Sequence, residues 1–440
     1  MASVSIAVTA ALHPLRLPAF RRLAAVRLVD ELGDWLGEIA LAVLVFDQTG
    51  SPLATAALFL ALLFVPAIAT PPLVARLEAY PSRISLPALN LVQGGAFAAI
   101  AMLSSDFSLL WVVPLATLAG ALAISNRALT RAAAATVVGP HGLLREGNAL
   151  LNISFTVGAA AGPAIAGLVV AGVGARTALF ADAASFAAVA LLLATATGLP
   201  EASPRAAHWR ARLREALGYV RERVQLRRLI GAQSAACVFF MIVIPVEVVF
   251  AKQTLGAGDA GYGVLLASWG TGMVIGGLAF AALRRAPLPL LLVLSTLAVG
   301  CAYLATAAAP TLLVACLASG VGGLGNGIQW VGVMTAVQQL TSPDFQARII
   351  SFLESLQTAS SGLGFLIGGA VAAIANPRVS FAVAGGGVLA VLGLAYAALA
   401  RAGWYPGAAT YSGPQPSSAD GTLTASHPPP AHPPGPTHPN

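Results

Sequence analysis

The sequence predicts an all-α polytopic membrane protein with twelve transmembrane helices arranged in two six-helix, pseudo-symmetric halves. Of its 440 residues, 57% are hydrophobic and 9% are charged, whereas about 25% of an average soluble domain is charged. The chain also contains twelve apolar runs of the length that a bilayer-spanning helix needs, about 20 residues. A pattern of polar, Pro-containing and Arg positions with the same spacing occurs once in each half, from Asn126 to Arg145 and from Gln329 to Arg348. Soluble enzymes, nucleic-acid-binding proteins and disordered proteins are poor fits to this composition.

The twelve runs are separated by charged or Pro/Gly-containing breaks, such as Asp47–Pro52, Gly139-Pro140 and Ser342-Pro343. Because the basic cluster of Arg16, Arg21 and Arg22 follows the mildly apolar N-terminal stretch instead of preceding it, no signal peptide is expected and the first run should remain as a helix. The expected helices span 24–46, 52–75, 84–104, 107–127, 149–172, 175–198, 229–251, 260–282, 286–307, 311–334, 349–374 and 379–401.

The distribution of basic residues predicts the orientation. If the N-terminus lies inside, 20 of the 24 Lys and Arg residues fall in inner segments, and Arg176, Lys252 and Arg378 fall in outer ones. Cytoplasmic loops of membrane proteins carry such an excess of positive charge. We therefore expect both termini in the cytoplasm and the protein in the cytoplasmic (inner) membrane.

The longest internal connection divides the chain. Residues 199–228 are expected to form a basic cytoplasmic linker, with an amphipathic helix around Trp209–Val224. The predicted organisation is a cytoplasmic N-terminus (1–23), an N-terminal bundle (24–198), this linker, a C-terminal bundle (229–402) and a Pro-rich tail (403–440). The tail cannot bury a core, so we expect it to be disordered. Its three histidines are weak metal-ligand candidates, and no metal site is predicted.

The repeated pattern supports two related halves. Asn126, Gly139-Pro140 and Arg145 recur as Gln329, Ser342-Pro343 and Arg348, each shifted by 203 positions, and Gly162 and Gly167 are echoed by Gly364 and Gly369. Parallel repeats related by an axis along the membrane normal are known from transporters that bind substrate between the repeats at mid-depth.

The first helix contains the most informative residues. Arg27, Asp30, Glu31, Asp34 and Glu38 fall within an arc of roughly 100° at 100° per residue. Since an ionised side chain at the bilayer centre costs about 2.5–3.5 kcal/mol on insertion scales, this stripe should face the protein interior or water. Arg27 can neutralise Asp30 or Glu31. Asp34 and Glu38 then have no local partner, and the alternatives are a proton-coupling or cation site and bonding between helices.

Two further acids lie in predicted helices of the second half. Glu247 follows Pro245 in the seventh helix, and Glu354 lies about two turns into the eleventh. The predicted proton-coupling set is Asp30, Asp34, Glu38, Glu247 and Glu354. For Glu247 the alternative is solvation near the outer interface. In the first half, Asp182 lies in the sixth predicted helix, and a structural role is favoured for it.

Other residues suit a cargo cavity or close helix packing. A ligand cavity needs apolar and aromatic walls with a few polar groups, and the candidates are Trp35, Gln93, Asn126, Asn152, Trp269, Asn326, Gln329, Trp330 and Gln357. A conformational role is predicted for Gly158, Gly162, Pro163 and Gly167, since small residues allow close helix approach and Pro bends a helix. Tight packing alone is the alternative.

The chain resembles the major facilitator superfamily. Phe20-Arg-Arg-Leu, Leu32-Gly-Asp34-Trp and Thr49-Gly-Ser-Pro52 are similar to the opening of the bacterial efflux branch that includes macrolide and enterobactin exporters. The run from Gly158 to Gly167 resembles the motif that proton-coupled exporters share, and Ala260–Gly270 resembles the eighth-helix entry of the same branch. One departure is the loop Pro72–Arg83, which lacks the usual Asp. Another is the Arg that many drug exporters have midway along helix 4, because Arg127 and Arg131 are expected near its inner end.

The resemblance implies a secondary transporter that exports a small amphipathic molecule in exchange for protons, acts as a monomer and uses no cofactor. The expected partners are the lipid bilayer, a small-molecule substrate and protons or sodium, without nucleic acid. Two alternatives remain: a proton-linked importer, and a transporter-like sensor or partner protein that no longer pumps. An enzyme is not expected, since the sequence contains no nucleophile–base pair and no phosphate-binding loop.

Overall fold

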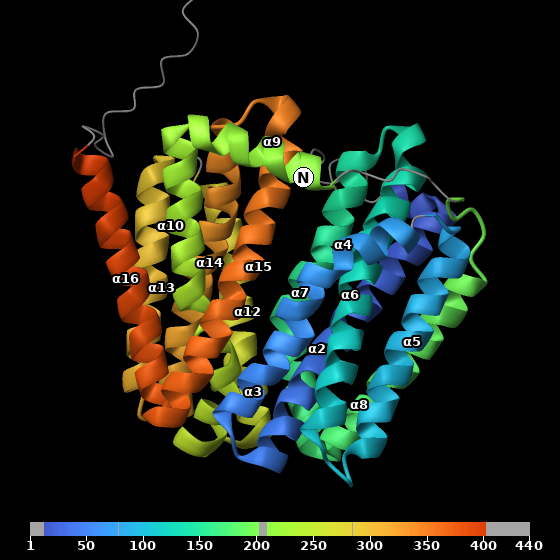
Figure 1. Ribbon diagram of the computed structural model, residues 1–440, viewed down its shortest axis with the longest axis horizontal. Coiled ribbons are helices and arrows are strands. Elements are labelled where there is room, and N and C mark those ends of the chain that lie inside the picture. The colour runs from blue at the N-terminus through green and yellow to red at the C-terminus, as the bar shows by residue number, and fades with distance from the viewer. Residues whose placement is uncertain (1–12, 78, 202–208, 284, 402–440) are drawn as a thin grey trace, which may run out of the picture.

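The computed structural model describes residues 13–77, 79–201, 209–283 and 285–401. The described part of the chain is helical and forms two bundles side by side (Figure 1). The predicted tail and its histidines lie outside the described residues.

The N-terminal bundle contains the helices that correspond to the first six predicted runs. A short turn, η1 (His13–Arg16), precedes them, and η3 (Gly139–His141) connects two of them. The helices are α2 (Pro18–Thr49), the continuous rod of α3 (Pro52–Phe59), π-helical η2 (Leu60–Phe64) and α4 (Val65–Leu77), α5 (Ser82–Leu103), α6 (Leu109–Val138), α7 (Leu144–Val173) and α8 (Ala175–Ala194).

The C-terminal bundle begins after a surface helix, α9 (Trp209–Glu222). Its first rod is interrupted, because Pro245 cannot donate a backbone hydrogen bond in a helix interior. That rod comprises α10 (Val224–Met241), η4 (Ile244–Val246), α11 (Glu247–Val249) and π-helical η5 (Phe250–Thr254). The others are α12 (Gly258–Ala282), α13 (Leu288–Ala308), α14 (Leu312–Gln339), α15 (Pro343–Ile374) and α16 (Pro377–Arg401).

Ten helical segments among the described residues are long and apolar enough to cross a membrane. The first predicted run, α2, is long but rich in charge, and the second contains the shorter apolar stretch Pro52–Ile68. The composition therefore agrees with an all-helical protein that spans the membrane many times.

The fourth helix is longer than predicted. The sequence predicts an end at 127, but α6 continues to Val138 through the sequence Ala-Ala-Ala-Ala, and Ala is the strongest helix former. Arg127 is thus not at a helix end. It lies eleven residues before the last residue of α6, deep enough to face the middle of the bundle.

The buried core differs between the two ends of the molecule. At the α9 end each bundle has its own apolar cluster: one around Phe20, Leu23 and Leu129, and another around Val337 and Leu353. At the opposite end a single cluster includes residues of both bundles, because Val248, Tyr262 and Phe365 join side chains of α2, α3 and α7. The bundles therefore share a core only away from α9.

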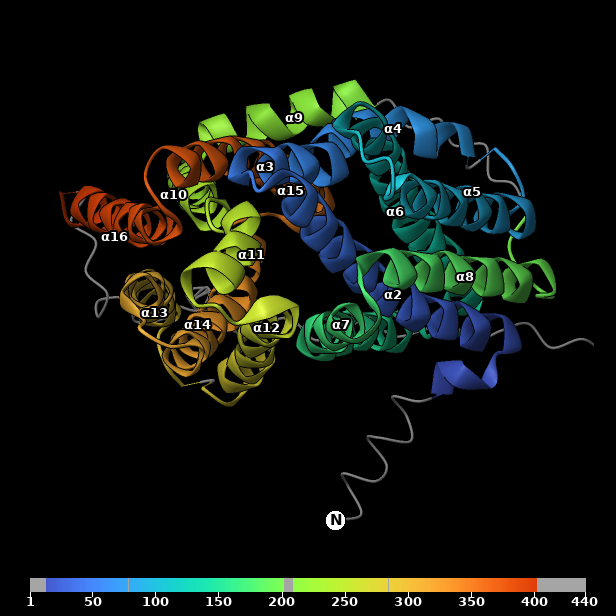
Figure 2. The ribbon, with the colours of Figure 1, turned by 90° about the horizontal axis from the view of Figure 1, so that it is seen from below.

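Two seams join the bundles, and both are visible in the view from below (Figure 2). In the first, α3 lies against α15, where the Phe59 and Phe365 ring centroids are 6.0 Å apart. In the second, α7 lies against α12, where a Cβ on Gly167 would be 2.6 Å from the Cα of Gly263. Gly369 of α15 faces Ala56 of α3 in the first seam, so the repeat-related residues Gly167 and Gly369 lie in corresponding seams.

The helix α9 is held on the C-terminal bundle. The Tyr219 hydroxyl accepts a hydrogen bond from the Ser342 backbone N–H (2.9 Å), and its ring stacks on Phe345 with centroids 4.4 Å apart. Arg348 pairs with Glu215 at 2.9 Å. The predicted basic helix therefore exists and is fixed to the start of α15.

Candidate functional site

An ion pair links α2 to α6 in the middle of the N-terminal bundle. Arg127 donates from Nη2 and Nε to Oδ2 of Asp34, at 2.7 and 3.3 Å. The Asp34 side chain is 13% exposed, and its other oxygen accepts a 3.4 Å hydrogen bond from Gln93 of α5. Since two guanidinium N–H groups reach one carboxylate oxygen, the pair is both charge-neutralised and geometrically fixed.

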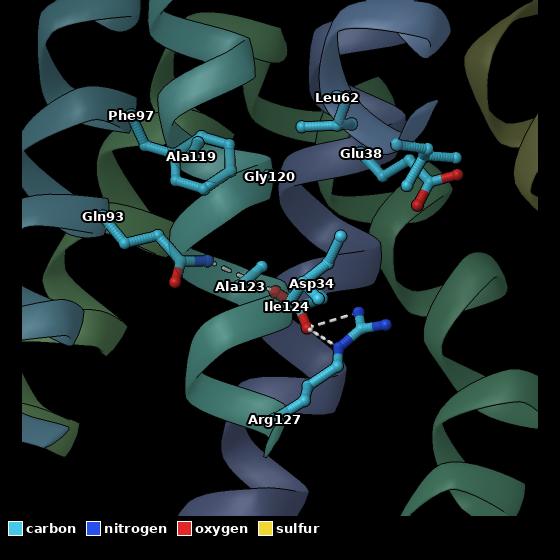
Figure 3. Close-up of a pocket in the computed structure, with 11 residues that line it drawn as sticks. Asp34, Glu38, Leu62, Gln93, Phe97, Ala119, Gly120, Ala123, Ile124 and Arg127 are labelled. Atoms are coloured by element: carbon cyan, nitrogen blue, oxygen red, sulfur yellow. Dashed lines mark hydrogen bonds and ion pairs between the residues drawn. The ribbon is translucent and has the colours of Figure 1, made fainter. Parts of the chain in front are cut away.

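A pocket opens beside this pair (Figure 3). Apolar side chains form most of its wall, and the π-helical turn η2 contributes two of them. The polar groups are Asp34, Glu38, Gln93 and Arg127; the apolar ones are Leu62, Leu63, Phe97, Ala119, Gly120, Ala123 and Ile124. The cavity is small, with a volume of about 40 Å³, and it combines an apolar wall with a few convergent polar groups.

Glu38 and Glu247 lie on elements of the two bundles that contact each other. Glu38 lies one turn beyond Asp34 on α2, and Glu247 is the first residue of α11, which contacts α2. Their charges are close enough to interact with each other and with the buried Tyr262. Among the described residues neither carboxylate has a hydrogen-bond or ion-pair partner. The sequence predicts no local partner for either Asp34 or Glu38. In the structure Asp34 is paired with Arg127, whereas Glu38 has no such partner among the described residues.

Asp30 belongs to a buried hydrogen-bond chain. Asn126 of α6 donates to its Oδ2 at 2.8 Å, and Asn90 of α5 donates to the Asn126 amide oxygen at 3.4 Å. All three side chains are buried, and the second oxygen of Asp30 has no partner among the described residues. These bonds join three helices, so Asp30 has a structural role here in addition to its charge.

Two further acids of the first bundle, Glu31 and Asp182, are held by an ion pair and by a glycine face. Arg27 pairs with Glu31, one of the two partners considered from the sequence. Asp182 of α8 is fully buried, and a Cβ on Gly33 or Gly37 would lie within 2.7 Å of its carboxylate oxygens. The two glycines of α2 thus make room for the acid of α8, which fits the structural role expected for Asp182.

The other predicted cavity residues do not form one group. Gln93 lines the pocket, and half-buried Trp35 packs on Gly162, where a Cβ would be 2.6 Å from its ring. Gln329 is buried and donates to Thr296 at 2.9 Å, joining α14 to α13. Asn326 and Gln357 are half-buried and Trp269 stacks on Tyr303, whereas Asn152 and Trp330 are exposed. Glu354, the fifth predicted coupling acid, is exposed on α15.

The three predicted glycines of α7 contact three different partners. Gly158 packs on Glu31, Gly162 on Trp35, and Gly167 on Gly263 of the other bundle. The carbonyl oxygen of Pro163 would lie 2.6 Å from a Cβ on Gly263. This helix therefore touches both the charged stripe of α2 and the seam between the bundles.

Sequence reasoning missed three functional candidates. Arg127 was assigned to a helix end, and its true place follows from the alanine run that extends α6. Asn90 showed no signal beyond being polar in an apolar run. Lys252 was counted as a loop charge, but it pairs with Asp47 (2.5 Å) and Asp259 (2.6 Å) and joins the bundles at the end opposite α9.

Comparison with known proteins agrees with this architecture. Residues 9–403 match the family described as transmembrane secretion effector. The nucleoside transporter NupG superposes with a TM-score of 0.68 at 13% identity, over 86% of this chain and 98% of that one. A bacterial homologue of the iron transporter ferroportin in an inward-facing state gives 0.67 at 14% identity, over 86% and 98%.

The peptide transporter POT in complex with sulfate gives a TM-score of 0.68 at 12% identity, over 87% of this chain and 94% of that one. Comparison with curated protein sequences gives no match. The identities to the solved structures are low, so those structures establish the fold alone. Because the family match covers most of the sequence, the chain belongs to the transmembrane secretion effector family of the major facilitator superfamily and is a multi-pass secondary transporter of small molecules, not an enzyme.

Proposed function

We propose that this transporter exports a small amphipathic molecule in exchange for protons by alternating access. The pair of Asp34 and Arg127 carries the proposal, because it places a carboxylate beside a fixed cation in the pocket of the N-terminal bundle. The α9 end faces the cytoplasm in this proposal, as the Arg-rich segments there predict. The transporter then resides in the cytoplasmic membrane and acts as a monomer.

The proposed coupling step is a change of partner by Arg127. When Asp34 is ionised, its charge holds the guanidinium group. A proton on Asp34 removes that attraction, and the charge of Arg127 is near enough to act on Glu38 of the same pocket. Since Glu38 interacts with Glu247 of the other bundle, the protonation state of Asp34 can influence how the two bundles meet. Such a step moves the transporter from one state to the other only if the proton binds one state more tightly than the other.

The arrangement of the cores supports an alternating mechanism. The bundles share an apolar cluster at the end opposite α9 and have separate clusters at the α9 end. In the proposed orientation this is a conformation open to the cytoplasm, from which a cargo enters before export.

The test begins with a resistance and accumulation profile of cells with and without the gene, over a panel of drugs and siderophores. The identified cargo is then followed in inverted vesicles under an imposed pH gradient. We expect Asp34→Asn and Glu247→Gln each to reduce gradient-driven transport strongly, with the exposed Asp106→Asn as the matched control. If both variants transport like the unmodified protein, the coupling assignment is wrong.

The same vesicles decide between the alternatives. Cargo that moves toward the cytoplasmic side together with protons would make the protein an importer. Absence of cargo-dependent proton flux over the whole panel would favour a sensor or partner protein.

A further inference from the structure

We infer that Asp182 of α8 carries a proton in the folded transporter and, as a neutral acid, positions the turn of α2 that carries Asp34. Asp182 does not line the pocket, so the inference goes beyond the proposed function. Its first measurement needs neither a cargo nor a proton gradient, and the transport measurement alone rests on the proposed function.

Asp182 is enclosed between α2 and α5, which both lie against α8 (Figure 2). Its side chain is fully buried. The ring of Phe97 from α5 stacks on that of Phe186, one turn after Asp182, with centroids 5.7 Å apart. A Cβ on Gly37 of α2 would meet both the Phe97 ring and Oδ2 of Asp182 within 2.8 Å. The carboxyl group therefore has no contact with solvent in this conformation.

The charged groups that act on Asp182 are other acids. They are Asp34 and Asp30, both on α2. Within the described ranges, α5 and α7 contribute no charged group to this set, and no cation pairs with Asp182. An ionised Asp182 would add an uncompensated charge to this buried group of acids, which is strongly unfavourable. A bound proton removes that charge.

The hydrogen bonds of Asp182 also fit a neutral acid. An ionised carboxylate offers about four acceptor sites, and buried polar groups are normally hydrogen-bonded. The Ser185 hydroxyl is 3.4 Å from Oδ1, but it lies closer, at 2.8 Å, to the backbone carbonyl oxygen of Asp182. Oδ2 accepts no hydrogen bond from the part of the chain that the structure describes. So few donors do not compensate a buried negative charge.

The acid contacts α2 at the two glycines that directly precede the acids of the pocket. A Cβ on Gly33 would be 2.7 Å from Oδ1 of Asp182, and a Cβ on Gly37 would be 2.6 Å from Oδ2. Asp34 follows Gly33 in the sequence, and Glu38 follows Gly37. The carboxyl group thus spans one turn of α2. Its shape sets how closely that turn approaches α8, and hence the direction in which Asp34 points.

Infrared spectroscopy tests the proton, because an un-ionised carboxylic acid has a carbonyl band separate from the bands of carboxylates. The full-length protein is measured at neutral pH in a detergent without carbonyl groups, and the spectrum of Asp182→Asn is subtracted from that of the unmodified protein. We expect the difference to contain a carboxylic-acid band. The exposed Asp106→Asn is the matched control and should give carboxylate bands alone. A difference for Asp182→Asn that contains carboxylate bands alone would overturn the inference.

A second measurement leaves Asp182 in place, in case Asp182→Asn does not fold. Asp30→Asn removes the other fully enclosed aspartate near α2, and the side-chain carboxyl groups of the remaining aspartates are labelled with ¹³C. We expect a carboxylic-acid band that the label shifts to lower frequency. Absence of a shifted band at neutral pH would equally overturn the inference.

Transport tests the positioning role. Asp182→Asn keeps the shape and the neutral state, so we expect gradient-driven transport and its pH profile to stay within about twofold of the unmodified protein. Asp182→Ala leaves Gly33 and Gly37 without their contact, and we expect transport to fall at least about tenfold. A displaced pH profile in Asp182→Asn, or equal transport in the two variants, would refute the role. If the unmodified protein shows no gradient-driven transport, the proposed function fails, whereas the infrared result still decides whether Asp182 is protonated.

Discussion

Arg127 of α6 and Asp34 of α2 form an ion pair of 2.7 Å between residues that lie 93 positions apart in the chain. The pair lies in a pocket that also contains Glu38, the next carboxylate along the same face of α2. This arrangement gives the transporter a charged centre in its N-terminal bundle.

The ion pair predicts different effects for two substitutions of Arg127. Arg127→Lys keeps the charge but loses the two-pronged contact, so we expect gradient-driven transport to fall about tenfold. Arg127→Gln also leaves Asp34 without a countercharge, and we expect a loss of about 100-fold. Both rates are measured in inverted vesicles at equal protein content. Equal activities of the two variants would show that the geometry of the contact is unimportant.

The seam between α7 and α12 predicts that a side chain at Gly167 cannot be tolerated. A Cβ there would be 2.6 Å from the backbone of Gly263, whereas a Cβ on Gly172 of the same helix meets nothing within 4 Å. We expect Gly167→Leu to separate the bundles at the end opposite α9 and to lower transport at least about tenfold. Labelling of a cysteine introduced at that end reports the separation. Gly172→Leu is the matched control, and equal labelling in the two variants would contradict the prediction.

Lys252 predicts an effect on the balance between conformations. It pairs with Asp47 of α2 and Asp259 of α12, so it ties the two bundles together at the end opposite α9. We expect Lys252→Met to shift the equilibrium about tenfold toward separation at that end, as measured by spin-label distances between the bundles. Lys252→Arg keeps the charge and should resemble the unmodified protein. Distances that do not change in Lys252→Met would exclude a role for this contact.

The repeat-related residues Asn126 and Gln329 predict unequal losses of stability. Asn126→Ala removes the donor to buried Asp30, and a buried charged group without its hydrogen bond costs about 1–3 kcal/mol or more. Gln329→Ala removes a bond to Thr296, whose hydroxyl still donates to the Leu292 carbonyl oxygen at 2.7 Å, so we expect a loss of about 1 kcal/mol. Thermal unfolding in detergent compares the two variants. A larger loss for Gln329→Ala would contradict this interpretation.

The sequence predicted the fold well because membrane helices are specified locally. Each needs about 20 apolar residues and satisfies its backbone hydrogen bonds within itself, so the runs and their breaks indicate the helices directly. The exceptions have local causes too. Polyalanine extended α6 beyond 127, and Pro245 divided the seventh rod into α10, η4 and α11.

The site was predicted in part. The stripe on α2 was visible because charges are expensive in a membrane, and it led to Asp34 and Glu38. The partner of Asp34 was not visible, since nothing in the spacing of Arg127 indicates which helix α6 packs against. The cavity residues were predicted from polarity alone. Polar groups that join helices, as in Gln329, have the same sequence signal as groups that line a pocket.

By itself the sequence determined the class of protein, the helices, the repeat and the one helix that carries unusual charge. These depend on composition and on contacts between near neighbours. Only the tertiary structure decided which charges are satisfied: Asp34 by Arg127, Asp30 by Asn126 and Glu31 by Arg27, while Glu38 and Glu247 have no hydrogen-bond or ion-pair partner among the described residues. Pairing depends on distances of a few ångströms between helices far apart in the chain, and helix packing sets those distances.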